Sequence, residues 1–448
     1  MTNDERVKYL IIGNSAGGIG AAEAIREIDK EGSMTIISDE PYPVYSRPLI
    51  SEYLGDGYSL ERMLYRPADF YEKSNIGTLF GEKVVQLNTK GHNVKLESDK
   101  SVKWEKLLLA TGGTPIIPRV PGVDLEGVFT FNKLDDARAV DEFINRFTKR
   151  IHVVVIGGGL IGASVSEALR KRDVRVTIVE MKDRVLNTIL DEETSALEAK
   201  ALEEAGVEII TDHTAVRIES YFPGEVSGVS LDDGRSLPCE MVILAVGVRP
   251  RLEFIEKSGI KINRGIVVGR HMETSAPDVY ACGDVAEAYD FVLGQNRLTP
   301  IWPNAYIGGR TAGLNIAGRD EEYPGGTSMN AVKYYGVKLV SAGLVEPPDD
   351  SYEVIRETHD DIYRKIILKD GKLVGLVFAG EIEMSGIVYN LMKDGIDVSG
   401  FKEALVSDDF GLTSLPEDIR KSRLEIPPDK YISMVTEIEE PEEVVVEE

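Results

Sequence analysis

Near its start, the chain has a largely apolar run followed by a glycine-rich turn and then a helical pattern. The apolar run covers residues 7–12, the turn residues 13–18, and the alanine-rich helical segment extends to about Lys30. A second apolar run, residues 34–37, is followed by Asp39. A short, largely apolar run predicts a buried strand, so this segment predicts a strand–turn–helix–strand unit.

The same order of elements recurs in the middle of the chain. Here the apolar run covers residues 151–156, the turn residues 157–162, and the helical segment extends to about Arg172. The second apolar run, residues 174–179, ends at Glu180. Such an internal duplication predicts two βαβ units with the same fold.

The rest of the chain completes the two units and adds a third. Each unit closes on an apolar strand that ends in Ala-x-Gly, at residues 106–112 and 241–247. Beyond about residue 326 the pattern changes to strands at 337–342, 363–369 and 373–378, followed by helices at 382–394 and 401–406. We therefore predict the α/β class, with two Rossmann-like dinucleotide-binding domains and a C-terminal α+β domain.

A glycine turn between a strand and a helix suits the binding of a pyrophosphate. The backbone can approach the phosphates, which then lie at the helix N-terminus with its free N–H groups. Asp39 and Glu180 lie 21 and 18 residues after the third glycines, Gly18 and Gly162, where an acid that binds a ribose hydroxyl is expected. Ser15 replaces the middle glycine of the first turn, and its small side chain still allows a close approach.

Composition and charge exclude several classes of partner. With 51 basic and 76 acidic residues, the net charge is −25, which argues against nucleic acid and anionic membranes as partners. The longest nearly uncharged apolar stretch, Val153–Val165, has 13 residues and is too short to span a membrane. The polar N-terminus leaves no room for a signal peptide, so we expect a cytoplasmic protein. Five scattered histidines show no ligand spacing, so no metal site is predicted.

The segment Thr274–Asp284 indicates a family. It follows the second FAD fingerprint of flavoproteins with two dinucleotide-binding domains, including the final Ala-x-Gly-Asp. The chain therefore resembles the FAD-dependent pyridine nucleotide-disulfide oxidoreductases over about residues 5–425. Residues 39–49 and 301–305 are similar to segments of the NADH oxidase-like, rubredoxin reductase-like and nitrite reductase flavin-subunit proteins of this superfamily.

The resemblance implies a role for each part of the chain. Residues 1–115 and 249–326 would form a discontinuous FAD-binding domain, and residues 116–248 an inserted NAD(H)-binding domain. Residues 327–425 would form a C-terminal interface domain of the kind that commonly makes a homodimer. Residues 426–448, of which seven in the last twelve are acidic, are interpreted as a solvated tail.

The resemblance also implies which residues bind the two cofactors. For FAD they are Gly13, Ser15, Ala16, Gly17, Gly18, Asp39, Glu40, Arg47, Pro48, Val84, Ala110, Thr111, Gly112, Gly283, Asp284, Trp302 and Ala305. For NAD(H) they are Gly157, Gly159, Leu160, Ile161, Gly162, Glu180, Val246 and Gly247. Asp284 is expected on the ribityl chain of the flavin, and Trp302 over its isoalloxazine ring.

The redox cysteine of a disulfide reductase is missing. Ser46 occupies its position, and a hydroxyl cannot exchange electrons with a flavin. Cys239 and Cys282 are interpreted as small buried residues, so no catalytic residue is predicted beyond the flavin. Relatives often have a Glu–Lys pair near the nicotinamide and the flavin, where this chain has Ser164 and, roughly, Ser51.

These features predict an FAD-dependent NAD(P)H oxidoreductase that prefers NADH and has no catalytic disulfide. Hydride passes from NADH to FAD, and electrons then pass to an acceptor, for which a rubredoxin- or ferredoxin-type carrier is favoured. Arg47, Arg66 and Arg310 are candidates to guide such a carrier. An NADH oxidase that reduces oxygen is the alternative. A flavin-binding subunit with an interaction role and little nicotinamide turnover is the alternative of another class, and Ser164 and the acidic tail favour it.

Overall fold

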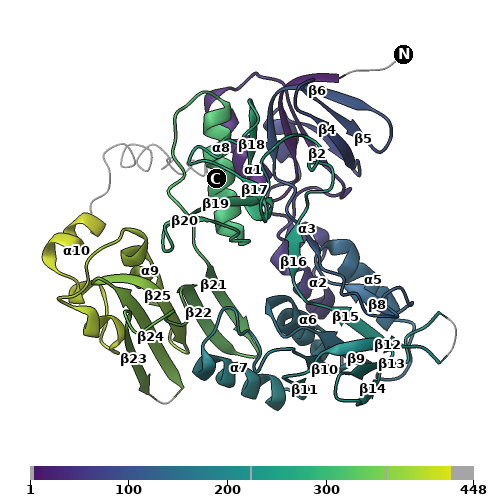
Figure 1. Cartoon of the computed structure of the whole chain (residues 1–448), viewed down its shortest axis with the longest axis vertical. Coiled ribbons are helices and arrows are strands. Elements are labelled where there is room, and N and C mark those ends of the chain that lie inside the picture. The colour runs from purple at the N-terminus through teal and green to yellow at the C-terminus, as the bar shows by residue number, and fades with distance from the viewer. Residues whose placement is uncertain (1–4, 222–223, 360, 425–448) are drawn as a thin grey trace, which may run out of the picture.

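Three units, each built on one main sheet with flanking helices, make up the computed structural model of the chain (Figure 1), which describes residues 5–221, 224–359 and 361–424. The first sheet lies at one end of the molecule, and the second and third lie side by side at the other (Figure 1). The acidic segment 426–448 lies outside the described residues. No helix within the described ranges has the length and apolar character needed to cross a membrane.

The first sheet contains the first glycine turn. Its strands are β1 (Glu5–Ile12), β2 (Met34–Ser38), β3 (Gly77–Phe80), β4 (Val84–Asn88), β5 (Asn93–Leu96), β6 (Ser101–Leu109) and β18 (Val279–Ala281). Their order is β3-β2-β1-β6-β5-β4, and β18 pairs with the second half of β6. The central strands β1, β2 and β6 run parallel, and most of their apolar side chains are buried, as their largely apolar sequences predict.

Two helices of the first unit approach each other closely, α1 (Ala16–Ile28) and α8 (Trp302–Ile316). A Cβ on Gly20 would lie 2.6 Å from the carbonyl oxygen of Tyr306. A Cβ on Gly309 would overlap the backbone of Gly17, and Gly313 meets the backbone of α1 in the same way. We call these four glycines, Gly17, Gly20, Gly309 and Gly313, the glycine seam. The seam holds α8 directly against the first turn.

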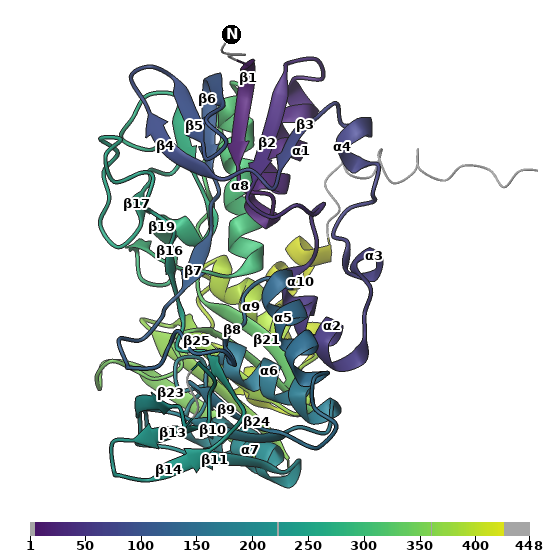
Figure 2. The same cartoon turned by 90° about the vertical axis from the view of Figure 1, so that its right-hand side faces the viewer.

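The chain leaves the first unit through β7 (Gly113–Pro115) and returns through β16 (Val248–Pro250). These two strands pair antiparallel, with Thr114 opposite Arg249. They lie between the first sheet and the second in Figure 2. The second unit is therefore an insertion whose two ends lie together.

The second unit repeats the architecture of the first. Its sheet has five parallel strands, β8 (Val128–Thr130), β9 (His152–Ile156), β10 (Arg175–Val179), β11 (Val207–Ile210) and β15 (Met241–Leu244), in the order β11-β10-β9-β15-β8. Its helices are α5 (Leu134–Ile144), α6 (Leu160–Lys171) and α7 (Glu192–Glu204). A separate three-stranded sheet, β12 (Ala215–Glu219), β13 (Gly228–Leu231) and β14 (Ser236–Pro238), completes it.

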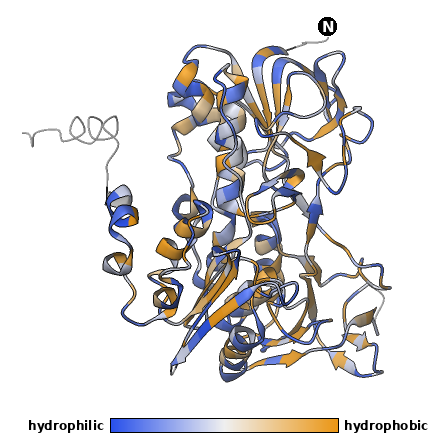
Figure 3. Cartoon of the chain, turned by 60° about the vertical axis from the view of Figure 1, so that its left-hand side comes forward, coloured by the Kyte–Doolittle hydropathy of each residue, from blue (hydrophilic) through white to orange (hydrophobic). Residues whose placement is uncertain are grey.

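The third unit is an antiparallel sheet with helices on one side. Its strands are β21 (Met329–Tyr334), β22 (Val337–Gly343), β23 (Glu353–His359), β24 (Ile362–Lys369) and β25 (Lys372–Ala379), in the order β21-β22-β25-β24-β23. Helices α9 (Ser385–Lys393) and α10 (Glu417–Leu424) follow. The segment predicted as a helix at 401–406 is a short 3-10 helix, Lys402–Val406. Figure 3 shows hydrophobic segments along the strands of the sheets, which fill the buried cores.

Short elements complete the chain. Helices α2 (Ile50–Asp56), α3 (Leu60–Met63) and α4 (Phe70–Lys73) connect β2 to β3. The strands β17 (Ile266–Val267), β19 (Ala286–Asp290) and β20 (Gln295–Arg297) form a small sheet beside α8. Of these, α2 matters most for the site, because it packs against α6 of the inserted unit.

Candidate functional site

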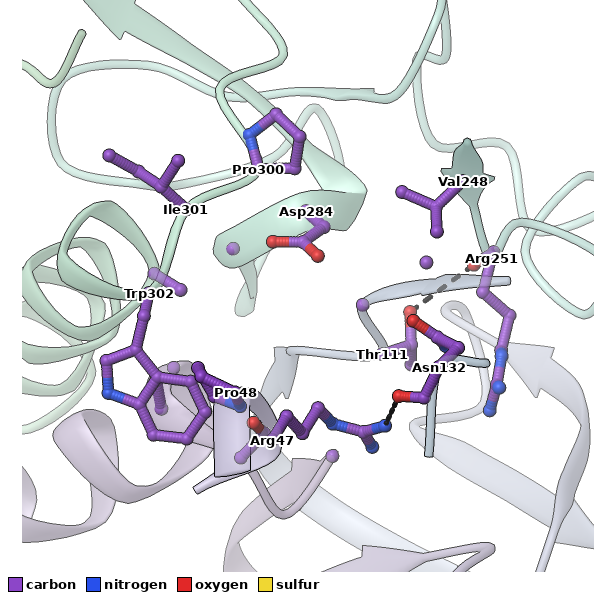
Figure 4. Close-up of a pocket in the computed structure, with 18 of the residues that line it drawn as sticks. Arg47, Pro48, Thr111, Asn132, Val248, Arg251, Asp284, Pro300, Ile301 and Trp302 are labelled. Atoms are coloured by element: carbon purple, nitrogen blue, oxygen red, sulfur yellow. Dashed lines mark hydrogen bonds between the residues drawn. The ribbon is translucent and has the colours of Figure 1, made fainter. Parts of the chain in front are cut away.

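A cavity of about 1140 Å³ lies where the three units meet. The first glycine turn and the start of α1 form one end, and α2 and α6 form the other. The edge strand β21 closes a third side, with all six of its residues in the wall. In Figure 4 the side chains of Arg47, Asp284 and Trp302 face the same space. The cavity is therefore long enough to join the two duplicated units.

The first glycine turn has the geometry of a phosphate-binding turn. Gly13 has a φ of 120°, which side chains rarely adopt, and a Cβ on it would overlap the carbonyl of Ala110. Gly18 packs equally closely on Gly13, so it supports the turn rather than lining the cavity. Ser15 is the N-cap of α1, and its side chain makes no capping hydrogen bond. The first N–H groups of α1 thus lie at the cavity wall.

The two acids after β2 have different surroundings. Asp39 lines the cavity, and its Oδ2 accepts a hydrogen bond from Arg251 at 2.8 Å. Glu40 is buried and is not among the lining residues. It accepts a hydrogen bond from the hydroxyl of Tyr45 at 2.5 Å and is paired with Arg47. Glu40 therefore positions Arg47, which does line the cavity.

An acid, Asp284, and a base, Arg47, both partly buried, face the cavity. Burial raises the pKa of the Asp284 carboxyl, and the charge of Arg47 opposes this rise. Arg47 also donates to the carbonyl oxygen of Asn132 at 3.2 Å (Figure 4). Trp302 begins α8 and meets the ring of Tyr65 edge-on, with the ring centroids 5.0 Å apart. The positive end of the α8 dipole consequently points toward the cavity wall.

Most other residues predicted to bind FAD also line this cavity. They are Ala16, Gly17, Pro48, Val84, Ala110, Thr111, Gly112, Gly283 and Ala305. The hydroxyl of Thr111 donates to the carbonyl oxygen of Arg251 at 3.3 Å (Figure 4). The structure thus brings together fragments that lie as far apart in sequence as Gly13 and Ala305.

The residues predicted to bind NAD(H) lie mainly beyond the cavity. Leu160 and Ile161 line it, whereas Gly157, Gly159, Gly162, Glu180, Val246 and Gly247 do not. The second turn has the same geometry as the first: Gly157 has a φ of 108°, and a Cβ on it would overlap the carbonyl of Ala245. Glu180 is 9% exposed and accepts hydrogen bonds from the N–H groups of Gly158 at 2.6 Å and Lys182 at 2.8 Å.

Several cavity residues were not predicted from the sequence. Glu52, Phe131, Asn132, Glu167 and Arg251 line the wall, as does the whole of β21. Ser51 and Ser164, expected where relatives often carry a charged pair, also line it. They come from loops, from helix faces and from an edge strand, where the residue pattern carries no signal for a shared site.

The two cysteines are buried, and the candidate guiding arginines Arg66 and Arg310 form ion pairs. Burial raises the pKa of both Cys239 and Cys282 to about 12. The two thiols lie in separate cores, although Cys282 is also part of the cavity wall. Arg66 is paired with an acid of α1, Glu23, at 2.5 Å, and Arg310 is paired with Glu27 of the same helix at 2.8 Å.

The cavity fits a flavin dinucleotide. It offers a glycine turn with helical N–H groups for a pyrophosphate, the carboxylate of Asp284 for a hydroxyl-bearing chain, and the aromatic residue Trp302 in its wall. A second glycine turn lies beside it, at the start of a helix that shares its wall. A cavity that reaches from the first turn to the helix after the second is typical of a flavoprotein reductase of the two-dinucleotide class.

Comparison with known proteins agrees with this class. Residues 7–309 match the family model described as pyridine nucleotide-disulphide oxidoreductase, and residues 329–396 match the rubredoxin NAD+ reductase C-terminal domain. The chain belongs to the pyridine nucleotide-disulphide oxidoreductase family. Its members include NADH-dependent oxidoreductases with FAD, and this protein is an FAD-dependent oxidoreductase that uses NADH.

Relatives cover nearly the whole chain. The NADH-dependent phenylglyoxylate dehydrogenase subunit epsilon of Aromatoleum evansii is 31% identical, over 90% of this chain and 96% of its own. The NADH-rubredoxin oxidoreductase of Clostridium acetobutylicum is 30% identical, over 91% and 99%. A crystal structure of a ferredoxin reductase from Rhodopseudomonas palustris has a TM-score of 0.82 and 25% identity, over 91% and 98%.

Proposed function

We propose that this flavoprotein passes electrons from NADH to a small electron-carrier protein, and that the final acceptor is a rubredoxin- or ferredoxin-type carrier. The single observation that carries this is the cavity, which connects the first glycine turn to the helix after the second. The match of the third unit to a rubredoxin reductase domain supports a carrier as acceptor. The relative from Clostridium acetobutylicum has the corresponding activity in its name.

The proposed FAD site uses residues from the whole length of the cavity. The N–H groups at the start of α1 would bind the pyrophosphate, and Asp39 a ribose hydroxyl through the oxygen not bound to Arg251. Asp284 would accept a hydrogen bond from the ribityl chain, and Trp302 would cover one side of the ring. Bound FAD would supply the acceptance of a hydride and the release of its electrons.

The proposed domain assignment follows the same division. Residues 1–115 and 249–326 would hold FAD, residues 116–248 NAD(H), and residues 327–425 would form the interface of a homodimer. The cytoplasm is the proposed location. Elution volume and light scattering of the purified protein test the dimer directly.

Anaerobic mixing with NADH tests the central proposal. Flavin absorbance should bleach within seconds, and the reduced protein should then reduce rubredoxin or ferredoxin faster than it consumes oxygen. An oxygen reaction faster than either carrier reaction would favour an NADH oxidase. Failure to bleach would favour a flavin-binding subunit, a role consistent with the Aromatoleum relative, which is itself a subunit.

We expect the protein to prefer NADH over NADPH by about tenfold or more. Glu180 is nearly buried at the end of β10, where its carboxylate would face a 2′-phosphate at close range, and like charges in a partly desolvated site repel by about 1–4 kcal/mol. The ratio of kcat/KM for the two cofactors measures this. Glu180→Gln should narrow the ratio, and equal values in the unmodified protein would show that Glu180 does not contact the ribose.

Activity should survive the loss of both thiols. Both cysteines are buried with a raised pKa, and Ser46 occupies the expected redox position, so electrons leave from the flavin itself. The double variant Cys239→Ser, Cys282→Ser should retain FAD and reduce a one-electron dye with NADH at a rate within about threefold of the unmodified protein. A fall of about a hundredfold with FAD still bound would place a thiol in the electron path.

A further inference from the structure

The interface between the second and third units contains a buried carboxyl group without a partner. Glu198 lies on the buried face of α7 with 0% exposure, and neither of its carboxyl oxygens has a hydrogen-bond partner among the described residues. A buried ionised carboxylate in such surroundings is costly, so the protonated form is favoured. Burial, together with the neighbouring charge of Glu167, raises the pKa of Glu198 to about 8.

Glu198 lies beside the contact by which the third unit holds α6. The hydroxyl of Tyr334 donates to the carbonyl oxygen of Leu160 at 3.3 Å, and the N–H of Tyr335 donates to Oε1 of Glu167 at 3.2 Å. Leu160, Glu167 and Tyr334 also line the cavity. The end of β21 and the turn after it thus contact α6, the helix whose first residues are proposed to bind NAD(H).

The groups that face Glu198 are acidic or neutral. Glu167 faces it from α6, and its charge also acts on the hydroxyls of Tyr334 and Tyr335 from the turn. The hydroxyl of Tyr335 is itself buried without a partner among the described residues. The guanidinium of Arg170 on α6 is engaged elsewhere, because it donates to backbone carbonyl oxygens at 3.0 and 2.8 Å.

A second fully buried acid of this interface, Asp191, is arranged differently. Asp191, at the N-terminus of α7, accepts hydrogen bonds from Lys365 at 3.0 Å and from the hydroxyl of Tyr363 at 2.6 Å. The Lys365 ammonium and the hydrogen bonds to Asp191 from Thr194 compensate its burial. Glu198 has no such compensation among the described residues, which leaves a proton as the means of neutralising it.

We propose that Glu198 is a positioning residue for nicotinamide binding: its proton keeps the Tyr334–Tyr335 turn on α6, and loss of that proton releases the turn. Ionisation would add a second negative charge beside Glu167 inside the packed interface, where repulsion is weakly screened. The turn would then separate from α6, and Leu160 in the cavity wall would no longer be held by the hydroxyl of Tyr334. This step rests on the proposed role of α6 in binding NADH.

The variant Glu198→Gln tests the proposal, because it keeps the shape of the side chain and removes its titration. Between pH 7 and pH 9, the KM for NADH should rise at least about threefold more in the unmodified protein than in the variant. The pH dependence of kcat should be the same in both proteins. Glu203→Gln, on the exposed face of α7, is the matched control and should behave as the unmodified protein. Equal pH profiles of KM for the unmodified protein and Glu198→Gln would overturn the proposal.

A second measurement does not depend on NADH. Because folding raises the pKa of Glu198, its contribution to stability is complete below the unfolded pKa of about 4.3 and is lost as pH rises toward 8. The melting temperature of the unmodified protein should therefore fall below that of Glu198→Gln across this range. In Glu167→Gln the loss should end at a lower pH, because the facing charge is gone. Identical melting curves at every pH would reject the proton on Glu198, whether or not the protein oxidises NADH.

Discussion

The variant Gly309→Ala is expected to purify largely without FAD and to melt at a lower temperature than the unmodified protein. The new Cβ would overlap the backbone of Gly17, which lies in the cavity wall at the proposed pyrophosphate site. Backbone cannot rotate away as a side chain can, so α8 and the first turn must separate, at a cost of about 1–3 kcal/mol or more. The ratio of flavin to protein absorbance after gel filtration measures the loss.

The neighbouring glycine of α8 provides the control. A Cβ on Gly308 would lie 3.2 Å from the terminal methyl group of Met272 and 3.5 Å from the Cβ of Cys282. Both are side-chain atoms, and the methyl group of Met272 can move aside. Alanine also has a higher helix propensity than glycine by about 1 kcal/mol, and this gain is shared by both variants. Gly308→Ala should therefore retain FAD and melt normally. Equal behaviour of the two variants would show that the glycine seam does not shape the site.

Replacing Asp284 should weaken FAD binding in a graded way. Asp284→Ala removes a hydrogen-bond acceptor from the cavity wall, which costs about 1–3 kcal/mol, or about five- to 150-fold in affinity. Asp284→Asn retains an acceptor oxygen and should lose less. Quenching of flavin fluorescence on titration of the apoprotein measures each dissociation constant.

Although Asp284→Asn should bind FAD more weakly than the unmodified protein, its ligand-free form should be more stable. Burial raises the pKa of Asp284, so its ionised form destabilises the ligand-free cavity. Asp284→Asn should therefore melt at a higher temperature than the unmodified apoprotein at pH 8. FAD affinity unchanged in Asp284→Ala would place the ribityl chain elsewhere, and with it the flavin.

The buried elements of the fold could be predicted from the sequence, and its edges could not. The runs at 7–12 and 151–156 are largely apolar because most of their side chains are buried on both faces of a sheet, and the structure confirms both strands. Lys8 and His152 are the polar exceptions. By contrast, β21 and β23 were not predicted. They are the edge strands of the third sheet and carry exposed charged residues, so their sequences lack the alternation of a half-buried strand.

The candidate site divides in the same way. The residues of the two glycine turns and of the segment Thr274–Asp284 could be predicted because they lie close together in sequence. The positive φ of Gly13 and Gly157 also requires glycine at those positions. The role of Arg251 could not be predicted from the sequence, because the residue it contacts, Asp39, lies 212 residues away along the chain. Glu198 was equally hidden in the sequence, since only the packing of two units shows that its carboxyl is buried.

The insertion of one unit within another sets the order in which the protein can assemble during synthesis. Every strand of the second sheet is encoded between residues 128 and 244, so this unit can fold as soon as that stretch leaves the ribosome. The first sheet is completed only later, because β18 joins β6 after residues 279–281 have emerged, and the seam closes later still with α8. A nascent chain can therefore complete the second unit before the first, and the proposed flavin cavity forms only near the end of translation.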